Sequence, residues 1–255
     1  MLLVRFEHER HTGYGRIDGD DLIHLTGPSF DQTTETGLRT RLSDARLLAP
    51  VAAPRIFGTA FTSRSQLAAL GKQAPTRPFI FMKPHTSVIG PGDPIAYPRQ
   101  STMVDFEGEI AVVIGKKCRN SAASQAMSFV FGYTCCNDVS ERTIQFDEMK
   151  YGALFLGKAI DTFCPLGPTI NTDIELSSLV MKTYLNGEIR QEAGADDFVF
   201  GVADIITYLS AAITLLPGDV ILMGSPAGYG EIKPGDRIDV EIEGIGRLTN
   251  PVVAE

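Results

Sequence analysis

The segment VDFEGEIAVVIG, residues 104–115, most constrains the fold, because it joins three acidic side chains to a continuous apolar run. Side chains of a β-strand alternate between its two faces, so Asp105, Glu107 and Glu109 are predicted to share one face. Beyond Glu109 both faces are apolar, which is typical of a buried strand. Buried carboxylates without a counterion would repel one another and take up protons. A divalent cation between Glu107 and Glu109 would remove that cost, and their hard oxygen atoms favour Mg²⁺, Mn²⁺ or Ca²⁺ over zinc.

An edge strand with a solvated acidic face is the alternative interpretation of this segment. A third acidic residue, Asp138, lies in CCNDVSERT, where an apolar strand is predicted to meet a loop. Ligands are often placed at such positions, although Asp138 could equally cap a helix that begins in SERTIQF. The residues alone leave both alternatives open.

Short strand patterns, interrupted by glycine and proline, run through most of the chain. The pair Asn186-Gly187 is the strongest hairpin signal. Helical patterns follow Ser121, expected as an N-cap, and occur at 141–151 and 201–216. Because strands outnumber helices, and the helices do not alternate regularly with them, the pattern predicts an α+β, mostly β fold rather than a doubly wound parallel sheet.

The N-terminal part of the chain is predicted to form a small subdomain. Residues 1–26 resemble short strands and tight turns, and residues 27–53 are polar and then modestly helical. Pro50 and Pro54 bracket an expected linker. We therefore expect a small N-terminal subdomain at 1–53 and a main domain at 54–255.

Composition excludes several classes of function. The formal net charge is −8, from 23 basic and 31 acidic residues, and no cluster of basic residues offers a surface for nucleic acid. No apolar run is long enough to span a membrane, and the N-terminus lacks a signal-peptide pattern, so we expect a cytoplasmic protein with no membrane partner. The four cysteines form no C-x-x-C pair and are expected to be buried free thiols.

Six blocks of the sequence, in order, resemble the fumarylacetoacetate hydrolase superfamily. They are DFEGEIAVVIGK, GYTCCNDVSERTIQ, GKAIDTFCPLGP, LNGEIRQ, LLPGDVILMGSPAGYG and KPGDRIDVEIEGIGRLTN. The resemblance covers about residues 55–253, and the segment before it is similar to the small domain that many members carry. Several ordered blocks are more specific than a single motif.

The resemblance implies a mixed β-roll with a small N-terminal β subdomain and a Mg²⁺ or Mn²⁺ site. Glu107, Glu109 and Asp138 match the family's metal ligands. Three further residues match its catalytic and substrate-binding positions: Lys158, Gln145, and Ser225, which stands in GSP where the family usually has threonine. Arg142 could bind a substrate carboxylate, or only pair with Glu141 or Asp138.

Substrates in this family are 2-oxo or 2,4-dioxo acids, whose carboxylate and 2-oxo oxygens can chelate the cation together. The cation then acts as a Lewis acid and stabilises an enolate, with Lys158 adding positive charge. Hydrolysis of a C–C bond, decarboxylation and keto–enol isomerisation can all proceed through such an enolate.

The sequence departs from the family at the lid that follows the first main-domain strand. Hydrolases and decarboxylases there carry N-Y-x-x-H with a glutamate shortly beyond, whereas this chain reads TSRSQ at 62–66. Of the four histidines, His8, His11 and His24 lie in the N-terminal segment, and His85 is expected to be structural or exposed. The missing histidine–glutamate pair argues against hydrolysis. Activation of water depends more strongly on such a pair than proton transfer on an enolate does.

The segments GTAFTSRSQL and FIFMKPHTSVIGPGDPIAYP are similar to the 2-hydroxyhepta-2,4-diene-1,7-dioate isomerase/5-oxopent-3-ene-1,2,5-tricarboxylate decarboxylase branch, and GKAIDTFCPLGP to acylpyruvases. The leading hypothesis is therefore a metal-dependent isomerase or decarboxylase of a 2-oxo dicarboxylic acid in aromatic catabolism. A C–C hydrolase of acylpyruvates or fumarylpyruvate is the alternative enzyme, and a metal-chelate binding protein without activity is the alternative from another class. The resemblance also implies a homodimer.

Overall fold

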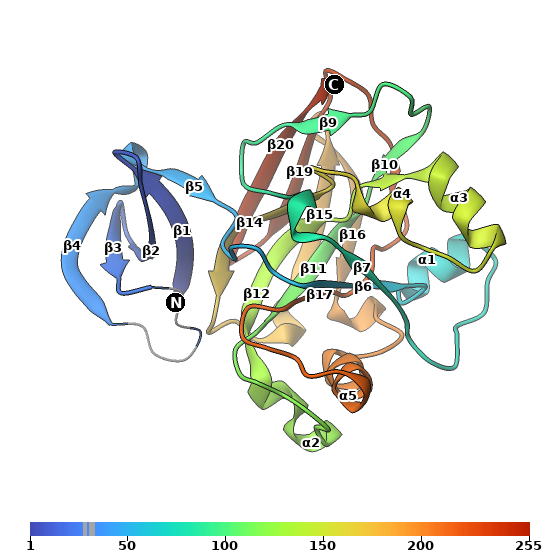
Figure 1. Ribbon diagram of the computed structural model, residues 1–255, viewed down its shortest axis with the longest axis horizontal. Coiled ribbons are helices and arrows are strands. Elements are labelled where there is room, and N and C mark those ends of the chain that lie inside the picture. Colours follow the sequence, from blue (N-terminus) through green and yellow to red (C-terminus); the bar gives the residue numbers. More distant parts are fainter. Residues whose placement is uncertain (28–29, 31–33) are drawn as a thin grey trace.

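The computed structural model describes residues 1–27, 30 and 34–255, in which β-strands outweigh helices. The predicted α+β, mostly β fold is confirmed, with a mixed roll of packed sheets (Figure 1). Among the described residues, no helix is both long and apolar enough to cross a membrane. The four cysteines are free and buried, as the sequence predicted.

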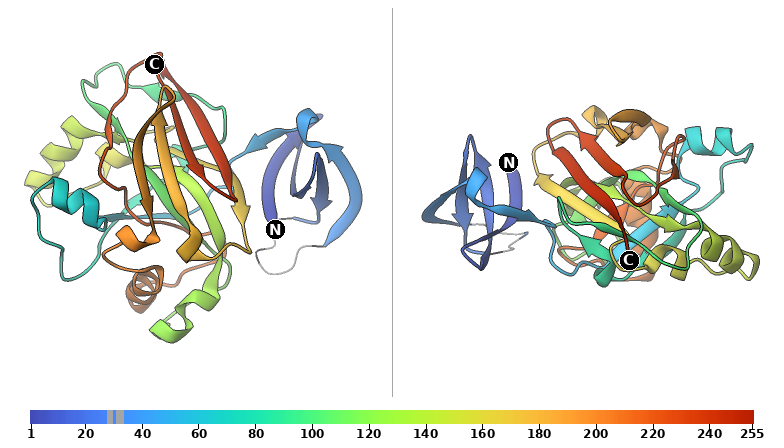
Figure 2. Two further views of the ribbon diagram at one scale, coloured as in Figure 1. Left: turned by 180° about the vertical axis from the view of Figure 1, so that it is seen from behind. Right: turned by 90° about the horizontal axis from the view of Figure 1, so that it is seen from above.

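The N-terminal strands form a lobe beside the main body, and the views in Figure 2 show the same separation. The lobe has its own small core around Val4, Phe6 and Leu22. It joins the body where Leu2 and Leu3 pair with strand β14. The helix predicted within 27–53 is wrong over the described residues, because this segment extends the sheet by pairing with β3. The strands of the lobe are β1 (Leu2–His8), β2 (His11–Asp18), β3 (Asp21–Leu25), β4 (Glu35–Arg41) and β5 (Arg46–Leu48).

The largest sheet continues from the lobe through the body, in the order β4-β3-β2-β1-β14-β12-β11-β17-β6-β7. The acidic segment lies at its centre, because β11 pairs with β12 on one side and β17 on the other. Its strands in the body are β6 (Ile56–Ala60), β7 (Phe79–Lys83), β11 (Gly108–Ile114), β12 (Val130–Asn137), β14 (Cys164–Asn171) and β17 (Val220–Leu222), and the short β8 (Val88–Ile89) pairs with β14.

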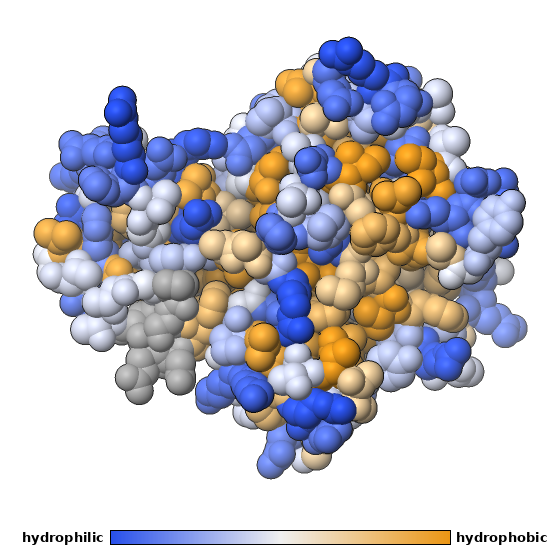
Figure 3. Space-filling model, viewed as in Figure 1, coloured by the Kyte–Doolittle hydropathy of each residue, from blue (hydrophilic) through white to orange (hydrophobic). Residues whose placement is uncertain are grey.

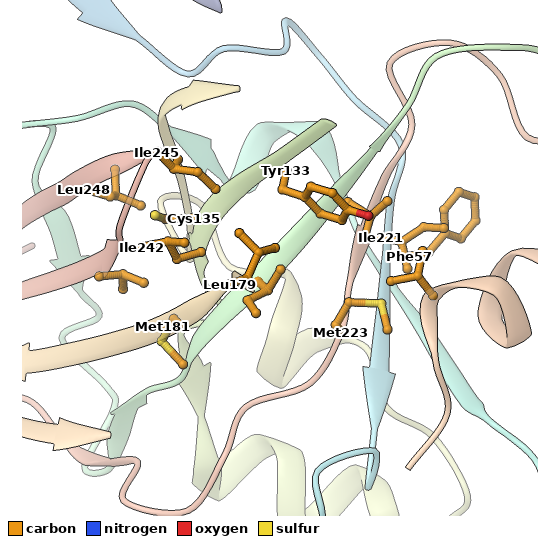
Figure 4. Close-up of a cluster of buried hydrophobic side chains, with 14 of the residues drawn as sticks. Phe57, Tyr133, Cys135, Leu179, Met181, Ile221, Met223, Ile242, Ile245 and Leu248 are labelled. Atoms are coloured by element: carbon orange, nitrogen blue, oxygen red, sulfur yellow. The ribbon is translucent and has the colours of Figure 1, made fainter. Parts of the chain in front are cut away.

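A second sheet packs on this one and encloses the main core. Figure 4 shows side chains of both sheets meeting there, such as Tyr133 and Ile221 from the first and Met181 and Ile242 from the second. The predicted hairpin forms, with Asn186 and Gly187 both at positive φ. The strands, in spatial order, are β16 (Glu188–Gly194), β15 (Val180–Leu185), β19 (Arg237–Ile242), β20 (Gly246–Ala254) and β9 (Ile95–Tyr97).

The helices are short and lie outside the sheets. The helix predicted after Ser121 is only four residues long, and Ala122 rather than Ser121 precedes it without a side-chain cap. The helix predicted at 141–151 forms, and Glu141 caps it by accepting from the Ile144 amide. The helices are α1 (Arg64–Ala69), α2 (Ala123–Ala126), α3 (Arg142–Lys150), α4 (Leu156–Ala159) and α5 (Val202–Ala212).

The acidic segment differs from the single strand that its alternation predicts. Strand β10 (Val104–Phe106) ends before Glu107 and pairs with β13 (Ser140–Glu141) and β18 (Gly230–Glu231) in a separate small sheet. The Glu107 amide donates to the Asn137 side chain instead of to a neighbouring strand. The break therefore lies at a proposed metal ligand, whose amide bonds a side chain while its carbonyl accepts from the Asp138 amide.

Candidate active site

Three buried carboxylates meet where β11 and β12 end. Glu107 precedes β11, Glu109 lies on it, and Asp138 directly follows β12. One oxygen of each carboxylate lies within 4.8 Å of the others, and each residue is at most 6% exposed. This buried geometry disagrees with a solvated acidic edge for Glu107 and Glu109, and with a helix cap for Asp138.

The glycine between the two glutamates allows a close approach of the neighbouring sheet. A Cβ atom at Gly108 would lie 1.9 Å from Thr183 Oγ1 and 3.0 Å from Met181 Sδ, both on β15. Real Cβ atoms do not approach other atoms so closely, and the Gly108 amide donates to Gln191 Oε1 at 3.0 Å. The E-G-E spacing therefore reflects both the acidic cluster and the packing behind it.

Three buried cations surround the carboxylates. Lys158, on α4, pairs with both Glu107 and Asp138. Lys83, at the end of β7, donates to Asp138 Oδ1 at 2.6 Å, and Arg142 donates to Glu107 Oε1 at 2.8 Å. Buried ion pairs of this kind hold their members in fixed positions, because separating them would leave a charge without a partner.

Glu107 and Glu109 experience different electrostatic environments. Burial raises the pKa of Glu107, but Arg142 and Lys158 outweigh burial and lower it to about 2. The pKa of Glu109 is raised well above its usual value, first by burial and then by the negative charges of Asp138 and Glu107. Its carboxylate accepts from the Gly224 amide at 2.6 Å, but no lysine or arginine lies within 4 Å of it among residues 1–27, 30 and 34–255.

The cluster suits a hard divalent cation. Three carboxylates in close reach supply the oxygen ligands that Mg²⁺ and Mn²⁺ prefer. With Asp105, four acids face three cations here, so one negative charge remains uncompensated. The repulsion that raises the pKa of Glu109 is the repulsion that a bound cation would relieve.

The predicted site residues all line one pocket of about 160 Å³. Arg142 links several of them, because it pairs with Asp105 and Glu107 and donates to Gln145 Oε1 at 2.7 Å. It does not pair with Asp138 or Glu141, which the sequence left open. The seven are Glu107, Glu109, Asp138, Arg142, Gln145, Lys158 and Ser225.

Ser225 lies in the loop that follows β17. Its hydroxyl accepts from Gln191 Nε2 at 2.7 Å, and the same amide donates to the Pro226 carbonyl. The preceding Gly224 has a φ of +99° and lies against Thr62, so a side chain would fit neither the conformation nor the space. These contacts hold the loop against both the lid segment and Glu109.

Lys83 and Asp105 have larger roles than the sequence indicated. Lys83 is 1% exposed and pairs with Asp138. Its position between the apolar strand FIFM and a proline is the sequence feature that could have predicted its burial. Asp105 is buried and pairs with Arg142, outside the triad. Burial raises the pKa of Asp105, although Arg142 opposes this.

Among the described residues, no histidine lines the pocket. His85 is exposed, and His8 and His11 face each other across the β1–β2 hairpin. The lid segment instead forms α1, whose Gln66 reaches the pocket and whose Arg64 is exposed. Among the described residues, Glu107, Glu109 and Asp138 are the one group of three or more acidic, histidine or cysteine side chains close enough together to hold a metal ion.

The fold and this site define a class: mixed β-roll proteins with a carboxylate cluster at the base of a pocket. A family model described as fumarylacetoacetate (FAA) hydrolase C-terminal matches residues 55–253, and one described as Rv2993c-like, N-terminal matches residues 1–50. The chain therefore belongs to the fumarylacetoacetate hydrolase family, which confirms the resemblance found in the sequence. The domain boundary at residue 53 stays a prediction.

Curated relatives cover most of the chain. Protein Rv2993c of Mycobacterium tuberculosis (strain ATCC 25618 / H37Rv) is 43% identical over 227 residues, which are 88% of this chain and 84% of the relative. Oxaloacetate tautomerase YisK of Bacillus subtilis (strain 168) is 35% identical over 226 residues, which are 83% of this chain and 74% of the relative.

Two similar solved structures carry enzyme names. That of 5-carboxymethyl-2-hydroxymuconate delta-isomerase from Mycobacterium smegmatis has a TM-score of 0.93 and 39% identity, and covers 100% of both chains. That of maleylpyruvate hydrolase from Sphingobium sp. SYK-6, in complex with manganese(II) ion and pyruvate, has a TM-score of 0.80 and 30% identity, and covers 100% of this chain and 99% of the other. Isomerases, tautomerases and hydrolases thus share this fold.

Proposed function

We propose that this protein is a divalent-metal-dependent isomerase that interconverts the enol and keto forms of a 2-oxo dicarboxylic acid. The observation that carries the proposal is the buried triad of Glu107, Glu109 and Asp138 at the base of a pocket whose described lining includes no histidine. The triad suits chemistry through an enolate, and the lining offers no imidazole to activate water for hydrolysis.

The residues of this chain would divide the work as follows. Glu107, Glu109 and Asp138 would hold Mg²⁺ or Mn²⁺, which supplies Lewis-acid polarisation of a 2-oxo acid when bound. Lys158 keeps a raised pKa, because Asp138 and Glu107 outweigh the effect of burial, so its ammonium stays charged. It can donate a hydrogen bond from Nζ to a developing enolate oxygen, while Gln145 and Ser225 orient the carboxylate of the substrate.

Decarboxylation of a 2-oxo dicarboxylate is the second candidate, because it can pass through the same enolate and needs the same charge stabilisation. Relatives named oxaloacetate tautomerase favour isomerisation as the first reaction to test. The homodimer, the place in aromatic catabolism and the identity of the metal stay predictions.

The test assays the purified protein, with Mg²⁺ or Mn²⁺ present, on enol-oxaloacetate, keto-oxaloacetate and an acylpyruvate. We expect fast loss of the enol absorbance, with slower or no release of pyruvate. Glu109→Ala is expected to lower the rate at least a hundredfold, whereas Glu188→Ala, an exposed glutamate on β16, should have no effect. Acylpyruvate cleavage that outpaces enol conversion would contradict the proposal and favour a hydrolase.

A further inference from the structure

One cation of the pocket, Lys72, has no anionic partner among the described residues. Arg142 and Lys158 each pair with two carboxylates, whereas Lys72 has none within 4 Å among the residues that the structure describes. Lys72 is exposed, whereas the acidic triad is buried, so the two mark the mouth and the base of the same pocket. Lys72 also borders a neighbouring open depression with Pro75 and Phe79, which agrees with a place at the mouth.

The backbone of Lys72 is fixed by the end of α1. The Lys72 amide donates to the Leu67 carbonyl, and the Gly71 amide donates to the Ala68 carbonyl. Gly71 has a φ of +62°, so the three features together form a Schellman motif. Leu67 is buried and anchors the helix, so Lys72 leaves α1 in a defined direction.

The ammonium of Lys72 is placed by an aromatic ring. Lys72 Nζ lies 4.5 Å from the centroid of the Phe61 ring, within cation–π range. Phe61 has a φ of +59°, a strained conformation that bulky residues rarely adopt. Such strain persists where surrounding contacts impose it, and this backbone conformation places the Phe61 ring in the pocket lining next to Lys72.

Apolar side chains also line this pocket. Phe81 stands beside Lys158, whose Nζ is 5.1 Å from the ring centroid, just as Phe61 stands beside Lys72. Met149 and Leu154 contribute to the same lining. The pocket therefore combines a metal-binding base, a lysine at its mouth and apolar lining, which matches a short carbon chain with an anionic group at each end.

We propose that Lys72 binds the second carboxylate of a 2-oxo dicarboxylic acid whose 2-oxo acid end lies at the acidic cluster. This inference rests on the proposed function, which it deepens by naming the residue that selects dicarboxylates. Phe61 is the positioning residue for this contact. The exposed position at the mouth leaves the ammonium hydrated, so its contribution is selectivity between ligands rather than most of the affinity.

The test compares two ligands of equal length, 2-oxopentanedioate and 2-oxopentanoate, which differ only in the second carboxylate. Their binding is measured by calorimetry in the presence of Mn²⁺, so the result does not depend on turnover. We expect the wild type to bind the dicarboxylate about tenfold more tightly, and high salt to reduce this preference.

Lys72→Met removes the charge but keeps most of the stem over Phe61. We expect it to weaken dicarboxylate binding about tenfold and to leave monocarboxylate binding unchanged. Lys72→Arg should restore the preference, and Lys117→Met, at an exposed lysine outside the pocket, should not change it. Phe61→Gly accepts the positive φ but removes the ring, so we expect a reduced preference in a folded protein.

Three results would overturn the inference. A wild type without preference for the dicarboxylate excludes the subsite, and equal weakening of both ligands in Lys72→Met reduces Lys72 to a structural role. In both cases the proposed function stands, because the ligands still bind with Mn²⁺. If the wild type binds neither ligand with Mn²⁺, the proposed function fails and this inference fails with it.

Discussion

At the scale of single residues, the two glutamates of the E-G-E motif illustrate opposite balances of burial and charge. Glu107 is held by Arg142 and Lys158, and its pKa is lowered to about 2. Glu109 receives one backbone hydrogen bond and faces two like charges, and its pKa is raised. The charged form of Glu107 therefore stabilises the fold, whereas the charged form of Glu109 destabilises it.

This contrast predicts different costs for the two neutral substitutions. We expect Glu107→Gln to lower the free energy of unfolding of the metal-free protein by about 3 kcal/mol, because it leaves buried cations without their partner. Glu109→Gln should change it by less than about 1 kcal/mol, because its carboxyl is already disfavoured as an anion. Urea denaturation measures both values. Equal losses would show that the ion pairs do not hold Glu107.

Both substitutions should also reduce stabilisation by Mg²⁺ or Mn²⁺, since each removes a carboxylate of the triad. The rise in Tm on adding either ion checks this, with Glu188→Gln as a control at an exposed site. A full rise in Tm in Glu109→Gln would remove Glu109 from the ligand set.

Gly108 carries the next prediction at this scale. Gly108→Ala places a methyl group 1.9 Å from Thr183 Oγ1, so β11 and β15 would have to separate. We expect a loss of about 3 kcal/mol or more in the free energy of unfolding, together with weaker metal binding. Gly108→Ala combined with Thr183→Ala should recover part of the stability, because it removes the atom in closest conflict. No recovery would place the conflict with Met181, whose sulfur is 3.0 Å away.

At the scale of elements, α1 forms where the sequence resemblance predicts the family's lid, and Asp197 binds its N-terminal end. Ser63 and Ser65 donate to the Asp197 carboxylate through their hydroxyls, and the Ser65 amide donates to Oδ1 at 2.8 Å. Ser65 Oγ also accepts from the Ala227 amide, in the loop that carries Ser225. One carboxylate thus joins the lid helix to the loop at the pocket.

We therefore expect Asp197→Asn to loosen α1 without unfolding the protein. Hydrogen exchange of the amides of residues 63–72 should speed up by about tenfold, because the cap and its partners weaken by roughly 1–2 kcal/mol. Asp196→Asn, at the exposed neighbour, is the matched control. Unchanged exchange in Asp197→Asn would show that Leu67 packing alone holds the helix.

Local patterns predicted the elements whose cause is local. Asn186-Gly187 gave the hairpin, because both residues tolerate positive φ. The segment TGLRTRLSDARLLAP, predicted to be modestly helical, instead begins in strand β4, because pairing with β3 outweighs a weak helical propensity. The break at Glu107 and the burial of Lys83 could not be predicted, because both depend on partners distant in the chain, Asn137 and Asp138. The apolar strands next to the three acids suggested the triad, but the residues alone left a solvated edge and a helix cap open, and the family resemblance was needed to choose the three together.

At the scale of the whole molecule, a lobe and a body share one sheet but have separate cores. Figure 3 shows apolar side chains gathered on the body over β6 and β7, whereas the lobe is mostly hydrophilic on that face. Strand β7 ends the sheet there and exposes Phe79 and Met82. Two residues of β1 pair with the body, and Arg46 of the lobe also pairs with Asp93, but the lobe has a core of its own, so we expect it to respond separately to pH.

His24 supplies that response. It lies against the Phe6 ring, with Nε2 2.8 Å from Thr40 Oγ1. Burial and then the charge of His8 lower its pKa. The unfolded chain therefore binds a proton at His24 more readily than the folded lobe does. His24 accordingly lowers the stability of the lobe as the pH falls from about 7 through its unfolded pKa of about 6.5 and toward its folded pKa. Above pH 7 this effect is absent.

We expect the lobe to lose stability between pH 7 and pH 5 in the wild type. His24→Gln, which can still bond Thr40 but does not titrate, should show a smaller loss. Far-ultraviolet melts cannot separate the lobe from the body, so hydrogen exchange of β1–β4 is the measurement, with β11 and β12 as the internal reference. An equal loss in His24→Gln would assign the pH dependence to other groups, and parallel changes in β11 would show that lobe and body unfold as one unit.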